Sequence, residues 1–331
     1  MRVVLDAMGG DHAPQVTVEG GIWAAREYGI EVVMVGQRDL LEAELARHET
    51  AGLSLPVVHA SEVLEMEDEP ASAAKTKKDS SMAVGMELVR RGEADAFFSA
   101  GNSGGIMAVA LFRLGRVKGI KRPAASAVYP TLKGACVLLD VGANTDCKPE
   151  WLLQFAVMGG VYAEKALGLS NPRVGIISNG EEEGKGSILV KEAYQLLKGS
   201  HLNFIGNVEG KDVPLGLADV AVTDGFTGNV VVKLSEGLAK FLLGVIEKEI
   251  RSGTLTTMGG LLAKPALVKT KKLLDYSEIG GAPLLGVNGV VIIGHGRSNA
   301  KAVKNGIGVA KRAAEGRMLQ AISEGLAATI L

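Results

Sequence analysis

Five short glycine-rich turns carry most of the residues that could do chemistry, and each follows an apolar run typical of a buried strand. The turns span residues 6–14, 99–105, 140–144, 223–229 and 294–298. Parallel α/β sheets collect ligand sites at the carboxyl ends of their strands, and glycine lets backbone N–H groups approach an anion closely. A helix that starts just beyond a turn adds the positive end of its dipole. Together the turns predict a deep polar cleft for phosphate or another oxyanion.

The turn at 99–105 reads Ser-Ala-Gly-Asn-Ser-Gly-Gly and stands between a strand-like and a helix-like run. Its backbone amides predict an anion-binding nest formed by Gly101, Asn102, Ser103 and Gly104. The same residues fit the Gly-x-Ser-x-Gly nucleophile elbow, and the chain order Ser103, Asp224, His295 suits an α/β-hydrolase. Against that alternative, the elbow pattern is short, arises by chance in a glycine-rich chain, and leaves the other turns without a role.

Outside these turns, Lys185 is the charged residue with the clearest functional interpretation. It lies in Asn-Gly-Glu-Glu-Glu-Gly-Lys-Gly (179–186), directly after an apolar strand-like run. The three glutamates are typical of a solvated loop. A lysine on a flexible turn can reach a phosphate or a developing oxyanion. Neither a P-loop nor a Gly-x-Gly-x-x-Gly fingerprint occurs, so ATP and dinucleotide binding lack their usual sequence support.

Other turn residues have both a functional and a structural interpretation. His295, Arg297 and Ser298 are predicted to surround an anion, although Ser298 would also serve as a helix N-cap. His12 would either bind an anion or cap the first helix. Aspartates also lie in the turns, but nothing fixes a set of metal ligands, so we predict no metal and no cofactor; they are Asp6, Asp11, Asp140 and Asp224.

The composition excludes several classes of protein. The 331 residues are 47% apolar and 4% aromatic, with a formal net charge of −1. The chain can therefore build a large core, but it lacks the basic field and the aromatic residues of a nucleic-acid-binding surface. Cys136 and Cys147 lack zinc-ligand spacing and predict free thiols in a reducing compartment. No signal-peptide or membrane-spanning pattern is evident, which indicates a cytoplasmic protein.

Apolar β-branched runs alternate with helical periodicity along the chain, which predicts an α/β fold, an αβα sandwich with a mainly parallel sheet. We expect residues 1–331 to form one two-lobed unit. The expected strands are 3–6, 31–35, 56–59, 96–99, 124–128, 136–140, 173–177, 203–206, 220–223 and 290–293.

Two further segments have open interpretations. Pro265 is expected to split 254–275 into two short helices, which would be either an ordinary packed pair or an amphipathic hairpin on an anionic membrane. The residues predicted for that surface are Leu261, Leu262, Lys264 and Leu267. A basic run is either a solvated face or a docking site for an acidic protein; it contains Arg113, Arg116, Lys118, Lys121 and Arg122.

The motifs together resemble the bacterial phosphate acyltransferase family PlsX over essentially the whole chain. The resemblance rests on the glycine turns, the basic run with Pro123, Asn207-Val-Glu, and Gly280-Gly-Ala-Pro-Leu-Leu-Gly286. It implies a dimeric fold similar to phosphotransacetylases and isocitrate dehydrogenases. It also implies acyl transfer from acyl carrier protein to inorganic phosphate, for a membrane glycerol-3-phosphate acyltransferase, with a membrane-associated helical hairpin. In two turns the chain departs from the family: Ser103 replaces threonine, and Arg297 replaces a serine.

On this resemblance we expect direct acyl transfer, with positioning and oxyanion stabilisation as the main tasks of the protein. Lys185 would stabilise the oxyanion or the departing thiolate, Asn229 and Asp224 would orient substrate, and an apolar channel would hold the acyl chain. Asp6, His12 and Asn144 are predicted to contact substrate. The alternatives are a serine hydrolase using Ser103, a dehydrogenase of the same gross fold, and a non-enzymatic scaffold that recruits acyl carrier protein.

Overall fold

A single mixed sheet organises the chain in this computed structural model, which describes residues 1–329. Its strand order is β3-β2-β1-β4-β11-β10-β5-β6-β9-β7-β8. The strands are β1 (Arg2–Asp6), β2 (Glu31–Gly36), β3 (Val57–His59), β4 (Ala96–Ser99), β5 (Ala124–Thr131), β6 (Gly134–Leu139), β7 (Val174–Ser178), β8 (Phe204–Glu209), β9 (Val220–Val222), β10 (Ala282–Leu285) and β11 (Val291–Ile293). The helices are α1 (Gln15–Tyr28), α2 (Arg38–Leu45), α3 (Pro70–Thr76), α4 (Ser81–Arg90), α5 (Ser103–Arg113), α6 (Pro149–Leu167), α7 (Ile188–Lys198), α8 (Gly225–Ile250), α9 (Thr254–Leu273), α10 (Tyr276–Ile279), α11 (Ala300–Glu315) and α12 (Met318–Thr329).

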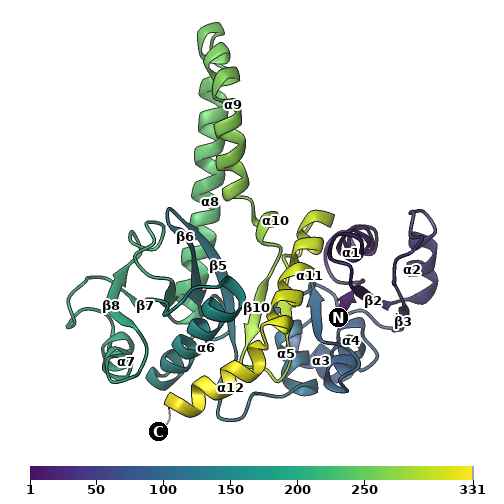
Figure 1. The fold of residues 1–331 in the computed structure, drawn as a ribbon, viewed down its shortest axis with the longest axis horizontal. Coiled ribbons are helices and arrows are strands. Elements are labelled where there is room, and N and C mark those ends of the chain that lie inside the picture. The colour runs from purple at the N-terminus through teal and green to yellow at the C-terminus, as the bar shows by residue number, and fades with distance from the viewer. Residues whose placement is uncertain (330–331) are drawn as a thin grey trace.

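Helices cover both faces of this sheet, as predicted from the sequence (Figure 1). Side chains alternate between the faces along a strand. In β1, Val3 and Leu5 belong to the hydrophobic cluster under α1 and α11, whereas Val4 belongs to the cluster under α4 and α5. The pairs β1–β2, β1–β4, β4–β11, β6–β9, β7–β9 and others are parallel, so the prediction of a mainly parallel αβα sandwich is confirmed.

The sheet changes direction at its centre and so divides into two lobes. Strand β10 is antiparallel to both β11 and β5, and β5 is antiparallel to β6. We call the half with β1–β4 and β11 lobe 1, and the half with β5–β9 lobe 2. The strands of lobe 2 that carry glycine turns therefore run opposite to those of lobe 1. One hydrophobic cluster includes residues of both lobes, among them Leu5 and Val137.

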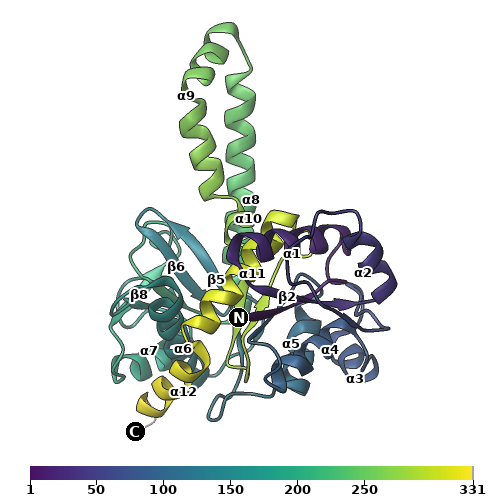
Figure 2. The same ribbon diagram turned by 45° about the vertical axis from the view of Figure 1, so that its right-hand side comes forward.

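Helices α8 and α9 leave the body side by side and form a projecting arm (Figures 1 and 2). The structure corrects the expectation for 254–275, because α9 is one helix with Pro265 inside it. A proline removes one backbone donor and leaves the carbonyl four residues earlier unbonded. No residue of α9 is buried, so water can reach the Leu261 carbonyl and the helix continues. Within residues 1–329, no helix combines the length and hydropathy needed to cross a membrane.

Candidate active site

In lobe 1, three of the predicted turns meet at one place. The Asp11 amide donates to the Gly296 carbonyl at 2.8 Å, and the Gly294 amide donates to the Ser99 carbonyl at 2.7 Å. The turns enclose a small hollow, which we call the lobe 1 cradle; its lining includes Gly9, Gly10, His12, Ala100, Gly296 and Ser298. His12 and His295 are exposed. The structure therefore brings the 6–14, 99–105 and 294–298 turns together, and of the predicted site residues His12 and Ser298 line the hollow.

Asp6 lies beneath this cradle and has no exposed surface. Its carboxylate accepts hydrogen bonds from the Ser99 hydroxyl at 2.7 Å and the Met8 amide at 3.2 Å. Ser99 in turn accepts from the Gly101 amide at 3.0 Å, so Asp6 connects two of the turns. Burial raises the pKa of Asp6, against the lowering effect of these hydrogen bonds. The prediction that Asp6 contacts substrate is corrected, because a fully buried carboxylate acts only through the turns that it holds.

The N-terminus of α5 follows Ala100, which lines the hollow. Asn102 caps the helix, with its side-chain oxygen accepting from the Gly105 amide at 3.0 Å. Its side-chain nitrogen donates to the Met66 carbonyl at 2.9 Å. Ser103 and Gly104 occupy the first helical positions, where no carbonyl of the helix reaches their amides. This end of α5 can therefore present N–H groups to an anion.

Lobe 2 contains a second cradle around Asp140, which also has no exposed surface. Its carboxylate accepts four backbone N–H groups at 2.7 to 3.2 Å, from Ala125, Gly142, Ala143 and Asn144. The Asn144 side chain adds a fifth hydrogen bond at 2.8 Å. Burial raises the pKa of Asp140, and the hydrogen bonds oppose that shift. We call residues 140–144, together with the start of α8, the lobe 2 cradle.

This second cradle is locked to the first turn of α8. The Asn144 carbonyl accepts from the Gly225 amide at 2.7 Å, while its side chain donates to the Pro123 carbonyl at 2.8 Å. Asn144 was predicted to bind substrate, but the structure engages its side chain in bracing the turn. A Cβ on Gly228 would come within 1.9 Å of the Asp140 carbonyl oxygen. Only glycine allows this close approach of helix and turn.

The predicted catalytic residues all belong to lobe 2. Asp224 caps α8, accepting from the Thr227 amide at 2.9 Å and from the Thr227 hydroxyl at 2.8 Å. The Asp224 carboxylate therefore caps α8, a role that the sequence analysis did not recognise. Asn229 is half-buried one turn further along α8. Lys185 is exposed in the loop after β7, and the Asn207 side chain donates to Glu182 of that loop at 2.7 Å.

The two cradles are separate, which corrects the expectation of one cleft that gathers all five turns. Helix α8 connects them: Asp224 begins it, and Glu236 forms an ion pair with Arg297 of the lobe 1 cradle at 3.3 Å. Asp224 and Glu236 are twelve positions apart, which corresponds to about 18 Å of helix. Asn229, Lys233, Glu236 and Lys240 follow at helical spacing. This polar face was present in the sequence but was not recognised as the link between the turns.

This arrangement does not assemble the serine-hydrolase triad. Asp224 holds Thr227 at the foot of α8, whereas the charged groups around His295 are Arg297, Glu236, Lys240 and Asp11. Ser103 is the first residue of α5. A triad requires the histidine within hydrogen-bond reach of both the serine and the aspartate. The geometry therefore speaks against a nucleophilic role for Ser103.

The remaining residues of the 294–298 turn are fixed by one another. The buried Ser298 hydroxyl donates to the His295 carbonyl at 2.5 Å and accepts from its amide at 3.2 Å. Asn299, not Ser298, caps α11. Partial burial lowers the pKa of His295, and the Arg297 cation lowers it further. Both effects favour the neutral imidazole, which carries one N–H donor.

The basic run connects α5 to β5 and is mostly exposed. Arg113 donates to the Lys78 carbonyl at 3.0 Å, and Arg122 lies over the Trp151 ring at 5.1 Å from its centroid. Both cysteines are free, and burial raises the pKa of each thiol to about 12. An apolar groove of about 420 Å³ lies between the β5–β6 turn and the base of α9, lined by residues that include Val128, Gly134, Lys269, Lys272 and Leu273. It is at the end of β6 remote from Asp140, so it belongs to neither cradle.

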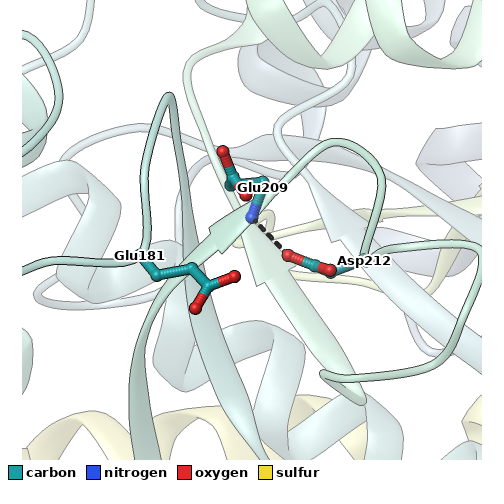
Figure 3. Close-up of side chains that lie close together, drawn as sticks. All are labelled: Glu181, Glu209 and Asp212. Carbon is teal, nitrogen blue, oxygen red and sulfur yellow. Dashed lines mark hydrogen bonds between the residues drawn. The ribbon is translucent and has the colours of Figure 1, made fainter.

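Three carboxylates also gather at the ends of β7 and β8 (Figure 3). Their oxygen atoms, from Glu181, Glu209 and Asp212, lie within 4.8 Å of one another. Lys211 forms ion pairs with both glutamates. Asp212 accepts the Glu209 amide at 3.1 Å. These contacts within the chain explain why the three carboxylates lie close together, and we assign the cluster no ligand.

Comparison with solved structures defines the class of fold. A phosphotransacetylase from Streptococcus pyogenes is 16% identical and superposes with a TM-score of 0.66 over 95% of this chain and 94% of that chain. A branched-chain phosphotransacylase from Enterococcus faecalis V583 is 15% identical, with a TM-score of 0.60 over 95% and 99% of the chains. At these identities the similarity shows the fold alone, which is the phosphotransacetylase-like α/β fold predicted above.

Other proteins are much more similar to this chain in sequence. A family model described as "Fatty acid synthesis protein" matches residues 1–320. The phosphate acyltransferase of Alkaliphilus oremlandii is 52% identical over 98% of this chain and 97% of its own length. That of Pelotomaculum thermopropionicum is 53% identical over 97% and 94%. The chain belongs to this fatty acid synthesis family, with the PlsX phosphate acyltransferases, as the motifs indicated, and it is an acyltransferase.

Proposed function

We propose that the chain transfers a long-chain fatty acyl group from acyl carrier protein to inorganic phosphate, forming acyl phosphate for phospholipid synthesis. The main support for this proposal is a sequence identity of 52–53% to phosphate acyltransferases over nearly the whole chain. The two glycine-rich cradles, joined by one polar face of α8, also support it. A phosphate oxygen attacks the thioester carbonyl carbon, the carbon–sulfur bond breaks, and the thiol leaves. No enzyme nucleophile is needed because phosphate is itself the nucleophile.

In this proposal, one lobe binds phosphate and the other lobe activates the thioester. The lobe 1 cradle holds phosphate with the α5 N-terminus, His12 and the His295–Ser298 turn. Lys185 stabilises the oxyanion or the leaving thiolate, and Asn229 orients the thioester. Asn229 lies between the cradles, about 7.5 Å along the helix axis from Asp224 and about 10.5 Å from Glu236. We therefore expect the reacting carbonyl to bind along the polar face of α8.

The decisive experiment is a phosphate-dependent thioester assay. Purified protein is mixed with palmitoyl-acyl carrier protein, with and without phosphate, and acyl phosphate is trapped with hydroxylamine. Phosphate-dependent loss of thioester with hydroxamate formed is the expected result, and Ser103→Ala should retain appreciable activity. Phosphate-independent release of fatty acid that Ser103→Ala abolishes would indicate a hydrolase instead. Binding of acyl carrier protein without turnover would indicate a scaffold, and tight nicotinamide binding a dehydrogenase.

Acyl carrier protein is proposed to dock on the basic run, whose exposed cations suit an acidic partner. These cations are Arg113, Arg116, Lys118, Lys121 and Arg122. The acyl phosphate product would pass to a membrane glycerol-3-phosphate acyltransferase. A protein that hands an amphiphile to a membrane enzyme gains from staying at the inner face of the cell membrane, and the arm offers a means of doing so.

Helix α8 carries an exposed apolar stripe beside its polar face, and we propose that a second copy of the chain covers it. Exposed side chains recur every three or four residues over most of the helix: Phe226, Val230, Leu234, Leu238, Phe241 and Val245. Such a stripe on a soluble helix normally packs against a partner. A homodimer that breaks up on Leu238→Glu, measured by light scattering, is expected.

The tip of the arm is proposed to bind an anionic membrane. Leu255 and Leu262 are 82% and 87% exposed, and Leu261 is exposed beside them. Lys264 and the half-buried Leu267 follow on the same helix, so apolar and cationic side chains combine as in interfacial helices. Leu262→Glu should abolish flotation with vesicles of phosphatidylglycerol while leaving turnover of soluble acyl carrier protein substrate intact. Unchanged flotation would assign the tip to protein contacts instead.

A further inference from the structure

An ion pair between Arg297 and Glu236 joins the lobe 1 cradle to the arm. The Arg297 guanidinium nitrogen lies 3.3 Å from a Glu236 carboxylate oxygen, and the two residues are 61 positions apart in sequence. Their side chains are 40% and 35% exposed. The contact is thus open to solvent and to small anions. It is also weak enough, as exposed ion pairs are, for a second anion to compete with it.

Arg297 stands within the turn that forms one wall of the cradle. Gly296 and Ser298, its neighbours on either side, both line the hollow. A guanidinium on this turn offers a fork of N–H donors that matches phosphate as well as it matches carboxylate. Neither Arg297 nor Glu236 lines the hollow in this structure, because the guanidinium is held at the Glu236 carboxylate on α8. The helix therefore holds a carboxylate against a cation that stands beside the hollow.

We propose that Glu236 is an internal competitor of phosphate for Arg297, so that the polar face of α8 sets the affinity of the cradle for phosphate. The Arg297–Glu236 pair closes the cradle when phosphate is absent. Phosphate binding transfers the guanidinium from the carboxylate to the phosphate oxygens. This inference rests on the proposed function, because it takes phosphate as the ligand of the lobe 1 cradle.

The test measures phosphate binding directly on the full-length protein by calorimetry at low ionic strength, where exposed charges are least screened. Glu236→Gln should tighten phosphate binding by about two- to fivefold, the range expected for release of one exposed ion pair. Glu247→Gln is the matched control: Glu247 is also on α8 and pairs with an arginine, Arg251 just beyond the end of the helix, at 2.6 Å, remote from the cradle. It should leave phosphate binding unchanged. The KM for phosphate should fall in Glu236→Gln and stay unchanged in Glu247→Gln, with kcat nearly constant in both.

Arg297→Ser separates competition from a general field effect. Removing a negative charge near the cradle would favour any anion, with or without the arginine. Under the proposal, Arg297→Ser weakens phosphate binding, and adding Glu236→Gln to it restores nothing. A tightening by Glu236→Gln that persists in the Arg297→Ser background, or a wild-type affinity equal to that of Glu236→Gln, would overturn the inference.

Failure of the proposed function is distinguishable from failure of this inference. If the wild-type chain forms no acyl phosphate while Glu236→Gln still tightens phosphate binding, the function is wrong and the competition stands. If acyl phosphate forms but the variants bind phosphate alike, the function stands and the competition is wrong. Thermal unfolding of each variant shows whether it is folded before either conclusion is drawn.

Discussion

The two cradles share one plan and differ in what their buried aspartate holds. Asp6 in lobe 1 and Asp140 in lobe 2 each end or follow a central strand, and neither has exposed surface. Asp140 accepts four backbone amides and a side-chain amide, whereas Asp6 accepts the Ser99 hydroxyl and the Met8 amide, with Ser81 and Gly9 as further hydrogen-bond partners. In lobe 2 the amides of the turn therefore bond to its own aspartate, and the turn fixes the start of α8. In lobe 1 the first amides of α5 have no carbonyl partner within the helix, and both histidines are exposed.

The difference teaches that similar glycine turns can serve different tasks. A turn whose amides all point at a buried carboxylate cannot also bind an anion through them. Under the proposed function, the lobe 2 cradle is a rigid support for Asn229, Lys185 of the same lobe supplies the cation, and the lobe 1 cradle binds the anion. Under the proposed function, substitutions in lobe 2 should change kcat, and those in lobe 1 should change the KM for phosphate.

The largest expected effect comes from Lys185→Ala. Loss of one preorganised donor to a developing oxyanion costs on the order of 100-fold or more in rate. Because Lys185 is exposed and in a loop, the substitution should leave the free energy of unfolding unchanged. The measurement is steady-state hydroxamate formation at varied phosphate, and kcat should fall with little change in the KM for phosphate.

His12→Ala is the lobe 1 counterpart in that assay. It removes an exposed donor from the hollow and should raise the KM for phosphate with kcat largely retained. If Lys185→Ala raised the KM and His12→Ala lowered kcat, the assignment of chemistry to lobe 2 and anion binding to lobe 1 would be reversed.

A smaller but sharper contrast is expected in stability between Asp140→Asn and Asp6→Asn. At Asp140 both oxygens accept N–H groups, so an amide nitrogen in place of either oxygen faces a donor. The cost should be about 2–4 kcal/mol in the free energy of unfolding. At Asp6 the Ser99 hydroxyl can rotate to accept from the new amide and still accept from Gly101. That cost should be about 1 kcal/mol.

Urea unfolding of both variants measures this contrast. Asp140→Asn should also lower kcat, because it loosens the contact between the 140–144 turn and the foot of α8 that carries Asn229. Equal destabilisation by the two substitutions would mean that the cradles are equally rigid, and the comparison between them would lose its basis.

Much of the fold could be predicted because its elements are local and strongly patterned. Strand β4 (Ala96–Ser99) falls where the apolar run ends in a glycine turn, and its predicted bounds are correct. Strand β10 (Ala282–Leu285) was missed because Pro283 and the two preceding glycines read as a turn. Strand β10 lies between the lobes and pairs with one strand on each side. These pairings are long-range contacts, so the local sequence around Pro283 does not reveal the strand.

The candidate site was predicted less completely, since its connections are long-range. The glycine turns were recognisable individually, but their division into two groups depends on strand directions that reverse at β10. Nothing in the sequence distinguishes an aspartate that meets substrate from one buried beneath a turn, and Asp6 and Asp140 proved to be the latter. The Arg297–Glu236 contact joins the 294–298 turn to α8, between residues 61 positions apart in sequence.

The smallest expected effect concerns the protonation of His295, and it tests whether α8 acts on lobe 1 through charge. Arg297 and Lys240 lower the pKa of His295, whereas Glu236 and Asp11 raise it. Arg297→Ser should therefore raise this pKa and Glu236→Gln should lower it, while Glu247→Gln should leave it unchanged. The imidazole proton shift followed by NMR from pH 5 to 8 measures the pKa, and His295→Gln assigns the signal among the five histidines. A pKa that moves in the same direction in the Arg297 and Glu236 variants would show that the 294–298 turn responds to altered packing, not to the charges that α8 presents to it.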